Sequence, residues 1–305
     1  MSPAKPITSI STKLMGIAEF RAGRRPDPVA PPIARVAMIR ISILAFLICC
    51  AATMAAADDL YRVQTVVTGQ GEANRIVGFA ACLEDVLIKV SGAVKLAGDP
   101  RLAAYQSRAG DFVKSHSYHD QMSGTPIRDE QGTRDRPYDL IVDFDEKKID
   151  GLLNALGLKP WLSHRPVVAV FIEMEQGTRN YIVTADAGLS AVAPREALLA
   201  AAQKRGMSIV LPSEAALAKS GLDGAGLAKL PPPALAARAA EQGGEVALVG
   251  RLKWDDADLG WATEWRMEWH GQPHRWQLRG VTFDEAFRRA IGGAAQILSG
   301  NGDPA

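Results

Sequence analysis

The chain has 305 residues, of which 47% are hydrophobic, and its formal net charge at pH 7 is +1. This length favours two modest domains over a single one. The balance of charge argues against nucleic acid as a partner, because binding to phosphates requires a strongly positive face.

Residues 38–57 have the three parts of a secretory signal peptide. A short basic start, Met38-Ile39-Arg40, precedes an apolar run over 41–52 that is too short to span a membrane. Small residues follow at Ala55-Ala56-Ala57, where a signal peptidase would cut. We therefore expect a mature protein that starts at Asp58 and is located in the periplasm.

Two further expectations concern the start of the chain. Residues 1–37 are rich in Pro and Arg without apolar periodicity, so they are a disordered extension or reflect a misassigned start codon. Cys49 or Cys50 would mark a lipoprotein, but neither follows a small residue, so the alanine-rich site is favoured.

The mature chain is expected to be acidic. Seven of the 35 Lys and Arg residues and two of the 34 Asp and Glu residues precede Asp58, which leaves 28 basic and 32 acidic side chains. No later segment is apolar over the length that a transmembrane helix needs. We therefore expect neither nucleic acid as a partner nor a transmembrane helix in the mature chain.

Residues 58–157 are expected to form an N-terminal domain with the order β-α-α-β-β-α. Strands are predicted over 60–68, 115–122 and 138–145, and helices over 72–90, 101–108 and 147–156. The first helix has an apolar stripe with helical spacing: Ile76, Phe79, Ala80, Leu83, Val86, Leu87 and Val90. Cys82, the one cysteine of the mature chain, lies inside this pattern and is expected to be a buried, inert thiol. A long polar loop is predicted over 123–137.

Residues 158–166 contain two prolines and no periodic pattern, which predicts a linker. Residues 167–299 form the predicted C-terminal domain, followed by a disordered tail over 300–305. Its first strand, 167–174, is continuously apolar, and helices and strands then alternate. The expected fold class is α/β with α+β character: two small mixed-sheet domains with helices packed mainly on one side.

The C-terminal domain is predicted to end in a three-strand antiparallel meander over 246–280 and a helix. Thr282 and Glu285 form a capping box at the start of that helix. Gly292-Gly293 within it indicates close packing against a neighbouring element. The tryptophans of strand 260–270 share one face. This face is either core under the last helix, the interpretation we favour, or a stacking platform for a glycan or peptide.

Candidate binding residues lie in the predicted linker. Trp161, His164 and Arg165 place an aromatic ring, an imidazole and a guanidinium group at a domain junction, where ligand clefts form. Packing between the domains is the alternative explanation of the same residues.

No catalytic, cofactor or metal site is predicted. His116 and His119 are three residues apart on a strand and therefore point to opposite faces, which argues against a shared metal. The acidic turn over 255–260 lacks the closing Glu of a calcium loop, and Gly69-x-Gly71 lacks the third glycine of a dinucleotide fingerprint.

Several short motifs resemble the bacterial secreted family called domain of unknown function 2066. They are Leu60-Tyr61-x-Val63, Lys89-Val90-Ser91-Gly92, Trp161 with Arg165-Pro166, and Leu248-Val249-Gly250-Arg251-Leu252. The resemblance implies a periplasmic or envelope protein without an assigned reaction, and it supplies no catalytic residues.

The function expected from the sequence is that of a non-catalytic binding or assembly factor of the cell envelope. Its partner would be an envelope protein or a cell-wall component. The alternative is a periplasmic hydrolase with an unrecognised site, which two or more perturbed titratable groups converging in one pocket would favour.

Overall fold

The structure is a computed structural model that describes residues 60–124, 128–129, 132–133, 136–186, 188 and 191–304. The predicted extension over 1–37, the signal peptide over 38–57 and the mature start at Asp58 lie outside the described residues. The described residues belong to one compact unit, within which two sheets each have their own hydrophobic core. The division into domains 58–157 and 167–299 stays a prediction.

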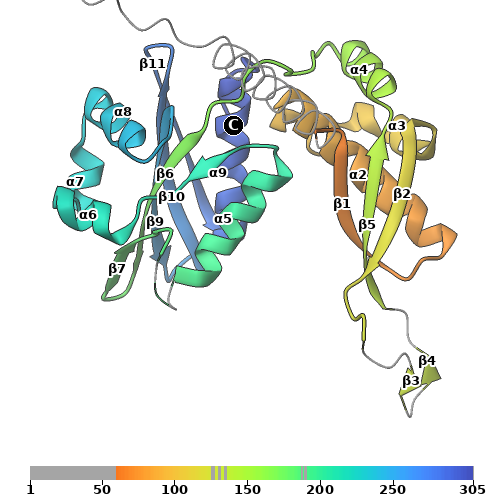
Figure 1. The fold of residues 1–305 in the computed structure, drawn as a ribbon, viewed down its shortest axis with the longest axis horizontal. Helices are drawn as coiled ribbons and strands as arrows, with labels where there is room; N and C mark the ends of the chain where they lie inside the picture. The colour runs from red at the N-terminus through yellow and green to blue at the C-terminus, as the bar shows by residue number, and fades with distance from the viewer. Residues whose placement is uncertain are drawn as a thin grey trace, which may run out of the picture. The chain divides into compact units, whose positions relative to one another are not determined.

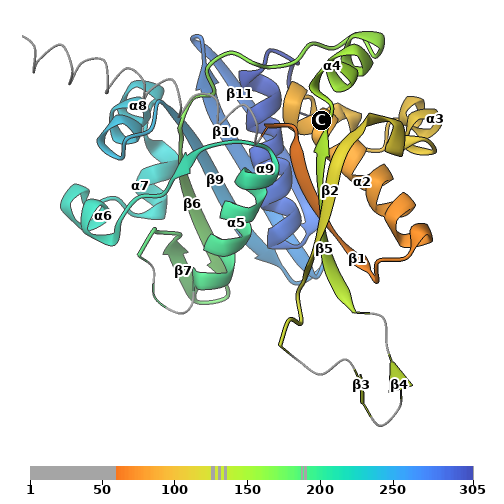
Figure 2. The ribbon, with the colours of Figure 1, turned by 45° about the vertical axis from the view of Figure 1, so that its right-hand side comes forward.

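The first sheet contains three antiparallel strands in the order β1-β5-β2. Its strands are β1 (Arg62–Thr68), β2 (Val113–Asp120) and β5 (Pro137–Phe144), and its helices are α2 (Glu72–Ser91), α3 (Ala103–Gln106) and α4 (Glu146–Ala155). The long helix α2 packs against this sheet (Figures 1 and 2). Three 3₁₀ turns, η1 (Val94–Leu96), η2 (Pro100–Leu102) and η3 (Ala109–Phe112), lie between α2 and β2. A short pair, β3 (Arg128–Asp129) and β4 (Gly132–Thr133), lies beyond the ends of β2 and β5 (Figure 2).

Helix α2 approaches the first sheet most closely at Gly78. A Cβ atom there would lie 2.5 Å from Leu140 Cδ2 and 2.8 Å from Val67 Cγ1, so a larger residue would push the helix off the sheet. The buried face therefore runs through Gly78, and Ile76, two residues earlier, is 52% exposed. The prediction that Ile76 belongs to the buried stripe is wrong for this reason. Cys82 is fully buried, and burial raises the pKa of its thiol to about 12.

The second sheet mixes parallel and antiparallel strands in the order β11-β10-β9-β6-β7, and β8 also pairs with β6. Its strands are β6 (Val168–Gln176), β7 (Arg179–Ile182), β8 (Ile209–Val210), β9 (Val246–Asp255), β10 (Gly260–Trp269) and β11 (Gln272–Val281). Strand β6 is parallel to β8 and β9, and the other pairs are antiparallel. The meander predicted over 246–280 is therefore confirmed.

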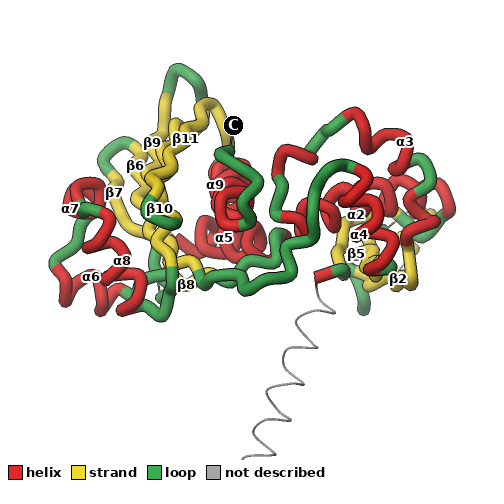
Figure 3. The backbone as a smooth tube through the Cα atoms, turned by 90° about the horizontal axis from the view of Figure 1, so that it is seen from above, coloured by secondary structure: helices red, strands yellow, loops and turns green. Residues whose placement is uncertain are grey.

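Helices cover both faces of the second sheet (Figure 3). They are α5 (Val192–Lys204), α6 (Glu214–Ser220), α7 (Gly224–Lys229), α8 (Pro232–Glu241) and α9 (Phe283–Leu298). Helices α5 and α9 pack on the larger core, and α7 and α8 pack on a smaller core that contains Phe171 and Val249. The α/β class with α+β character is confirmed, although the helices of this sheet lie on both sides and the first sheet is purely antiparallel.

The aromatic face of β10 is core beneath α9. Trp261 and Trp265 are buried there, together with Trp276 of β11. Trp265 donates from Nε1 to Thr263 Oγ1 at 2.9 Å and meets Phe287 of α9 edge to face at 6.4 Å. The favoured interpretation is therefore confirmed for these three rings.

Helix α9 begins at its predicted capping box, and the residues that follow it have more structure than expected. Thr282 accepts from the backbone of Glu285, as the capping box predicts. A Cβ atom on Gly292 would lie 2.7 Å from Val94, which confirms close packing at the glycine pair. The tail over 300–305 was expected to be disordered, whereas Asn301 and Asp303 bond to the chain (Asn301 N to Gln296 O, 2.9 Å; Gln296 Nε2 to Asp303 O, 2.6 Å). Among the described residues, no helix is long and apolar enough to cross a membrane.

Candidate functional site

The C-terminal end of α2, which packs on the first sheet, is hydrogen-bonded to residues that precede and follow the second sheet. The last carbonyl groups of a helix have no donor within the helix and must find one elsewhere. The donors are distributed as follows: Gly92 N to Ile88 O (2.8 Å), Arg165 Nη2 to Lys89 O (2.8 Å), Trp161 N to Val90 O (2.8 Å) and Asn301 Nδ2 to Ser91 O (2.9 Å). Three of the four therefore come from beyond residue 157, and they fix the end of this helix to the rest of the chain.

Arg165 caps two helices at once. Its Nη1 donates to Arg205 O at 3.1 Å and Gly206 O at 3.3 Å, just past the end of α5, while its Nη2 donates to Lys89 O. A cation suits both positions, because the C-terminal end of a helix carries partial negative charge. Burial lowers the pKa of Arg165 to about 10, so the guanidinium stays charged at neutral pH.

Trp161 lies beneath this guanidinium group. The Arg165 Cζ atom is 4.3 Å from the centre of the Trp161 ring, and the ring is only 7% exposed because it packs into the core of the second sheet. A side chain this buried offers little surface to a partner. Trp161 and Arg165 therefore pack the junction, as the alternative explanation expects, and their contact with a ligand stays a prediction.

His164 points elsewhere. Its Nε2 lies 2.8 Å from Glu245 Oε2, and Glu245 also accepts from Val167 N at 3.0 Å. These hydrogen bonds, first the one from Val167 and then the one from His164, lower the pKa of the Glu245 carboxyl. The structure thus brings Trp161 and Arg165 together and separates His164 from them.

A cleft of about 770 Å³ opens beside Trp161 and Arg165, within the range of known ligand sites. Its lining includes Leu162 and Leu199, which are 63% and 46% exposed. It also includes Tyr61, whose hydroxyl donates to Asp150 Oδ1 at 2.8 Å, and Glu146 one turn earlier on α4. Exposed leucines inside a cleft favour an apolar partner group.

Two groups that line the cleft, Tyr61 and Arg165, have shifted pKa values. Burial and the hydrogen bond to Asp150 raise the pKa of Tyr61, which keeps the phenol neutral. The lowered pKa of Arg165 still leaves that group charged. General acid–base catalysis is most efficient when the pKa of the group lies near the working pH, and neither of these two pKa values does. Among the described residues, no group of three or more His, Cys, Asp or Glu side chains is placed to hold a metal ion.

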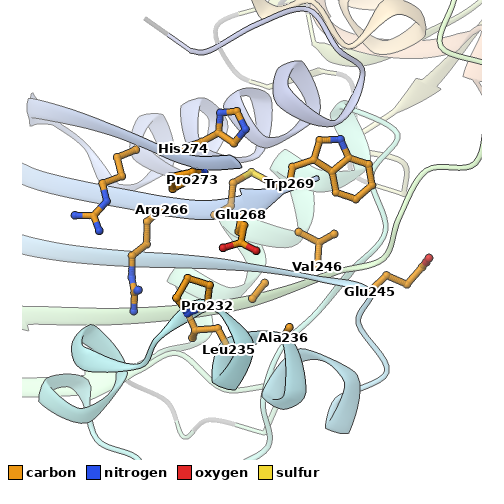
Figure 4. A pocket seen from close by; sticks show the side chains of 13 residues that line it. Pro232, Leu235, Ala236, Glu245, Val246, Arg266, Glu268, Trp269, Pro273 and His274 are labelled. Atoms are coloured by element: carbon orange, nitrogen blue, oxygen red, sulfur yellow. The ribbon is translucent and has the colours of Figure 1, made fainter. Parts of the chain in front are cut away.

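A second pocket, between α8 and the outer face of β10 and β11, is much smaller. Its volume is about 170 Å³, and Pro232, Leu235 and Ala236 of α8 face Glu268 across it (Figure 4). Arg266, at its side, donates to Leu227 O and Leu230 O and so closes the end of α7. The pocket lies below the size of typical ligand sites, so the junction cleft is the better candidate.

The sequence patterns missed the exposed residues of the cleft. Leu162 is a lone apolar residue in the linker, and Leu199 follows the buried Leu198 on α5, outside its packed face. Glu146 and Asp150 are spaced i, i+4 and so share a face of α4. An apolar residue in a segment without periodicity was the one available signal.

Comparison with known proteins gives one partial match. Residues 55–162 match a family described as Domain of unknown function (DUF8605). The match ends at Leu162, within the segment 158–166. No curated protein matches the chain. The assignment to domain of unknown function 2066 is wrong, because the match is to a different family.

The physical reason for that error lies in the motif. Lys89-Val90-Ser91-Gly92 is the end of α2, where Gly92 has the left-handed conformation (φ 74°) that closes a helix. A third to a half of helices end in this conformation. The motif therefore reports a helix end and does not identify a family.

Proposed function

We propose that this chain is an exported, non-catalytic cell-envelope protein that binds a partner in the junction cleft. The observation that supports the proposal best is the exposure of Leu162 and Leu199 inside a cleft of about 770 Å³. Trp161 and Arg165 also line the cleft and are held by contacts within the chain, so this part of the cleft is formed before binding. Preorganisation of this kind favours affinity.

Export is proposed from the signal peptide pattern over 38–57, with a mature start at Asp58 and a periplasmic location. Intact-mass spectrometry of the native protein should give the mass of Asp58–Ala305. A mass that includes Met38, or a lipid on Cys50, would contradict this start.

Binding is favoured over hydrolysis by the state of the polar groups in the cleft. The two groups with strongly perturbed pKa values, Tyr61 and Arg165, are held neutral and charged, respectively, at pH 7. Neither supplies an acid, a base or an activated nucleophile there. Two shifted groups in one cleft meet the criterion set for the hydrolase alternative, but neither pKa lies near neutral pH, so we favour binding.

Affinity capture with matched leucine variants tests the proposal. The double variant Leu162→Gln/Leu199→Gln should lose most of the partner that the mature wild-type protein retains from its own periplasm, because the apolar part of the lining becomes polar. Leu259→Gln is the control, since Leu259 is 78% exposed but does not line the cleft. Equal capture by all three proteins, quantified by mass spectrometry, would refute binding at this cleft.

A further inference from the structure

We propose that the junction cleft takes a peptide segment of the partner protein in which Lys or Arg lies next to an apolar residue. This inference rests on the proposed function and adds the chemistry of the bound segment. The reason is that the basic groups of the cleft already form hydrogen bonds within the chain, whereas its acidic groups can still bind a ligand.

Leu162 and Leu199 give the cleft its apolar character. Leu162 comes from the segment between the sheets and Leu199 from α5, and Met207 and Ile209 continue the lining. Together they form an apolar strip with two leucines still exposed to solvent. Covering these leucines with an apolar side chain releases water from both surfaces, which is favourable.

The basic groups of the cleft are already engaged. Among the described residues, four charged ones line it: Lys89, Glu146, Asp150 and Arg165. Lys89 is 5% exposed and donates from Nζ to Arg62 O at 2.9 Å, while the Arg165 guanidinium donates to carbonyl oxygens at two helix ends. Both cations are therefore engaged by groups of the chain itself.

The acidic groups remain available. Asp150 accepts the Tyr61 hydroxyl and keeps a second carboxylate oxygen, and Glu146 is exposed and forms no ion pair within the described part of the chain. The two carboxylates lie one helical turn apart on α4, at the start of which Asp145 is the cap. A cation beside an apolar side chain would complement both the carboxylates and the leucines, whereas an anion would meet two like charges on α4.

Fluorescence anisotropy with the full mature chain tests this inference. The probes are four fluorescein-labelled hexapeptides that alternate Leu with Lys, Leu with Gln, Leu with Glu, and Ser with Lys. The Leu-Lys peptide should bind on the order of tenfold more tightly than the Leu-Glu and Ser-Lys peptides. High salt should reduce the preference for Lys over Glu, because exposed charges are screened.

Charge variants locate the effect. Glu146→Gln/Asp150→Asn should remove the preference for Lys over Glu, and Asn keeps an acceptor for the Tyr61 hydroxyl. Glu264→Gln/Glu268→Gln changes the net charge equally at exposed positions outside the cleft and should leave the preference intact. Circular dichroism melting curves of both variants show that a lost preference is not caused by unfolding.

The possible outcomes separate the two proposals. If the Leu-Glu or Leu-Gln peptide binds as tightly as Leu-Lys, and Leu162→Gln/Leu199→Gln abolishes that binding, the inference is refuted and the proposed function stands. If no peptide binds, or if a soluble peptidoglycan digest occupies the cleft instead, the inference is also refuted. If, in addition, the leucine variants capture the same partner as the wild type, the proposed function fails as well.

Discussion

Replacing Arg165 by alanine is expected to lower the free energy of unfolding by about 3–5 kcal/mol, because several carbonyl oxygens lose a hydrogen bond to a charged donor, each worth about 1.5–3 kcal/mol. The guanidinium group donates to carbonyl oxygens after α5 and at the end of α2, and it covers the Trp161 ring at 4.3 Å. Without it, these acceptors would stay buried without donors. Urea unfolding followed by far-UV circular dichroism measures the change.

Two further variants test whether the hydrogen bonds of Arg165 are the cause of the lost stability. Arg165→Lys keeps the charge but has fewer donors in a different geometry, so its loss should be intermediate. Arg238→Ala removes a partly exposed guanidinium that pairs with Glu241 one turn later, and it should change stability by less than about 0.5 kcal/mol. Equal stability of Arg165→Ala and Arg238→Ala would show that Arg165 does not hold the junction.

Replacing Trp265 by alanine should lower the free energy of unfolding by about 3–5 kcal/mol, as for other buried aromatic residues. Trp265 is 2% exposed in the core under α9, and its indole donates to Thr263. The substitution leaves a cavity between the sheet and Phe287 and an unpaired hydroxyl. Thermal or urea unfolding of the full mature chain gives the value.

Gly250 provides a sharper test of the same packing. A Cβ atom at Gly250, which pairs with Trp265 across the strands, would lie 2.1 Å from Trp265 Cζ3, so Gly250→Ala should destabilise the wild type. In the Trp265→Ala background this clash is absent, and the two effects should not add. Gly151→Ala in α4 is the control. A Cβ atom at position 151 would have no neighbouring atom within 4 Å, and the free energy of unfolding should rise by up to about 1 kcal/mol. Additive effects at Gly250 and Trp265 would contradict the packing.

The regular elements were predictable because their patterns are local. Strand β10 alternates between core and solvent, and α9 carries both its cap and its apolar stripe within its own sequence. The exposure of Ile76 is not predictable in this way, because α2 contacts the sheet through Gly78. A pattern of apolar residues does not include glycine and so does not reveal this contact. The segment predicted as a helix over 101–108 is instead a 3₁₀ turn and a four-residue helix.

The site was only partly predictable, because its key contacts are made by backbone oxygens. The linker residues Trp161 and Arg165 were singled out for their side chains, yet what positions them is a set of carbonyl groups at two helix ends. Every residue has a carbonyl group, so composition and spacing do not reveal which ones lack a donor. The cleft also combines residues from Leu60 to Ile209, a proximity that arises only in three dimensions.

The most direct test of partner binding at the junction cleft is site-specific photo-crosslinking in the native periplasm. A photoreactive amino acid at position 199, which lies in the cleft, should yield a discrete crosslinked adduct upon irradiation. The same group at position 259, which is more exposed but outside the cleft, should yield none. An adduct at position 259 and none at position 199 would contradict binding in the cleft.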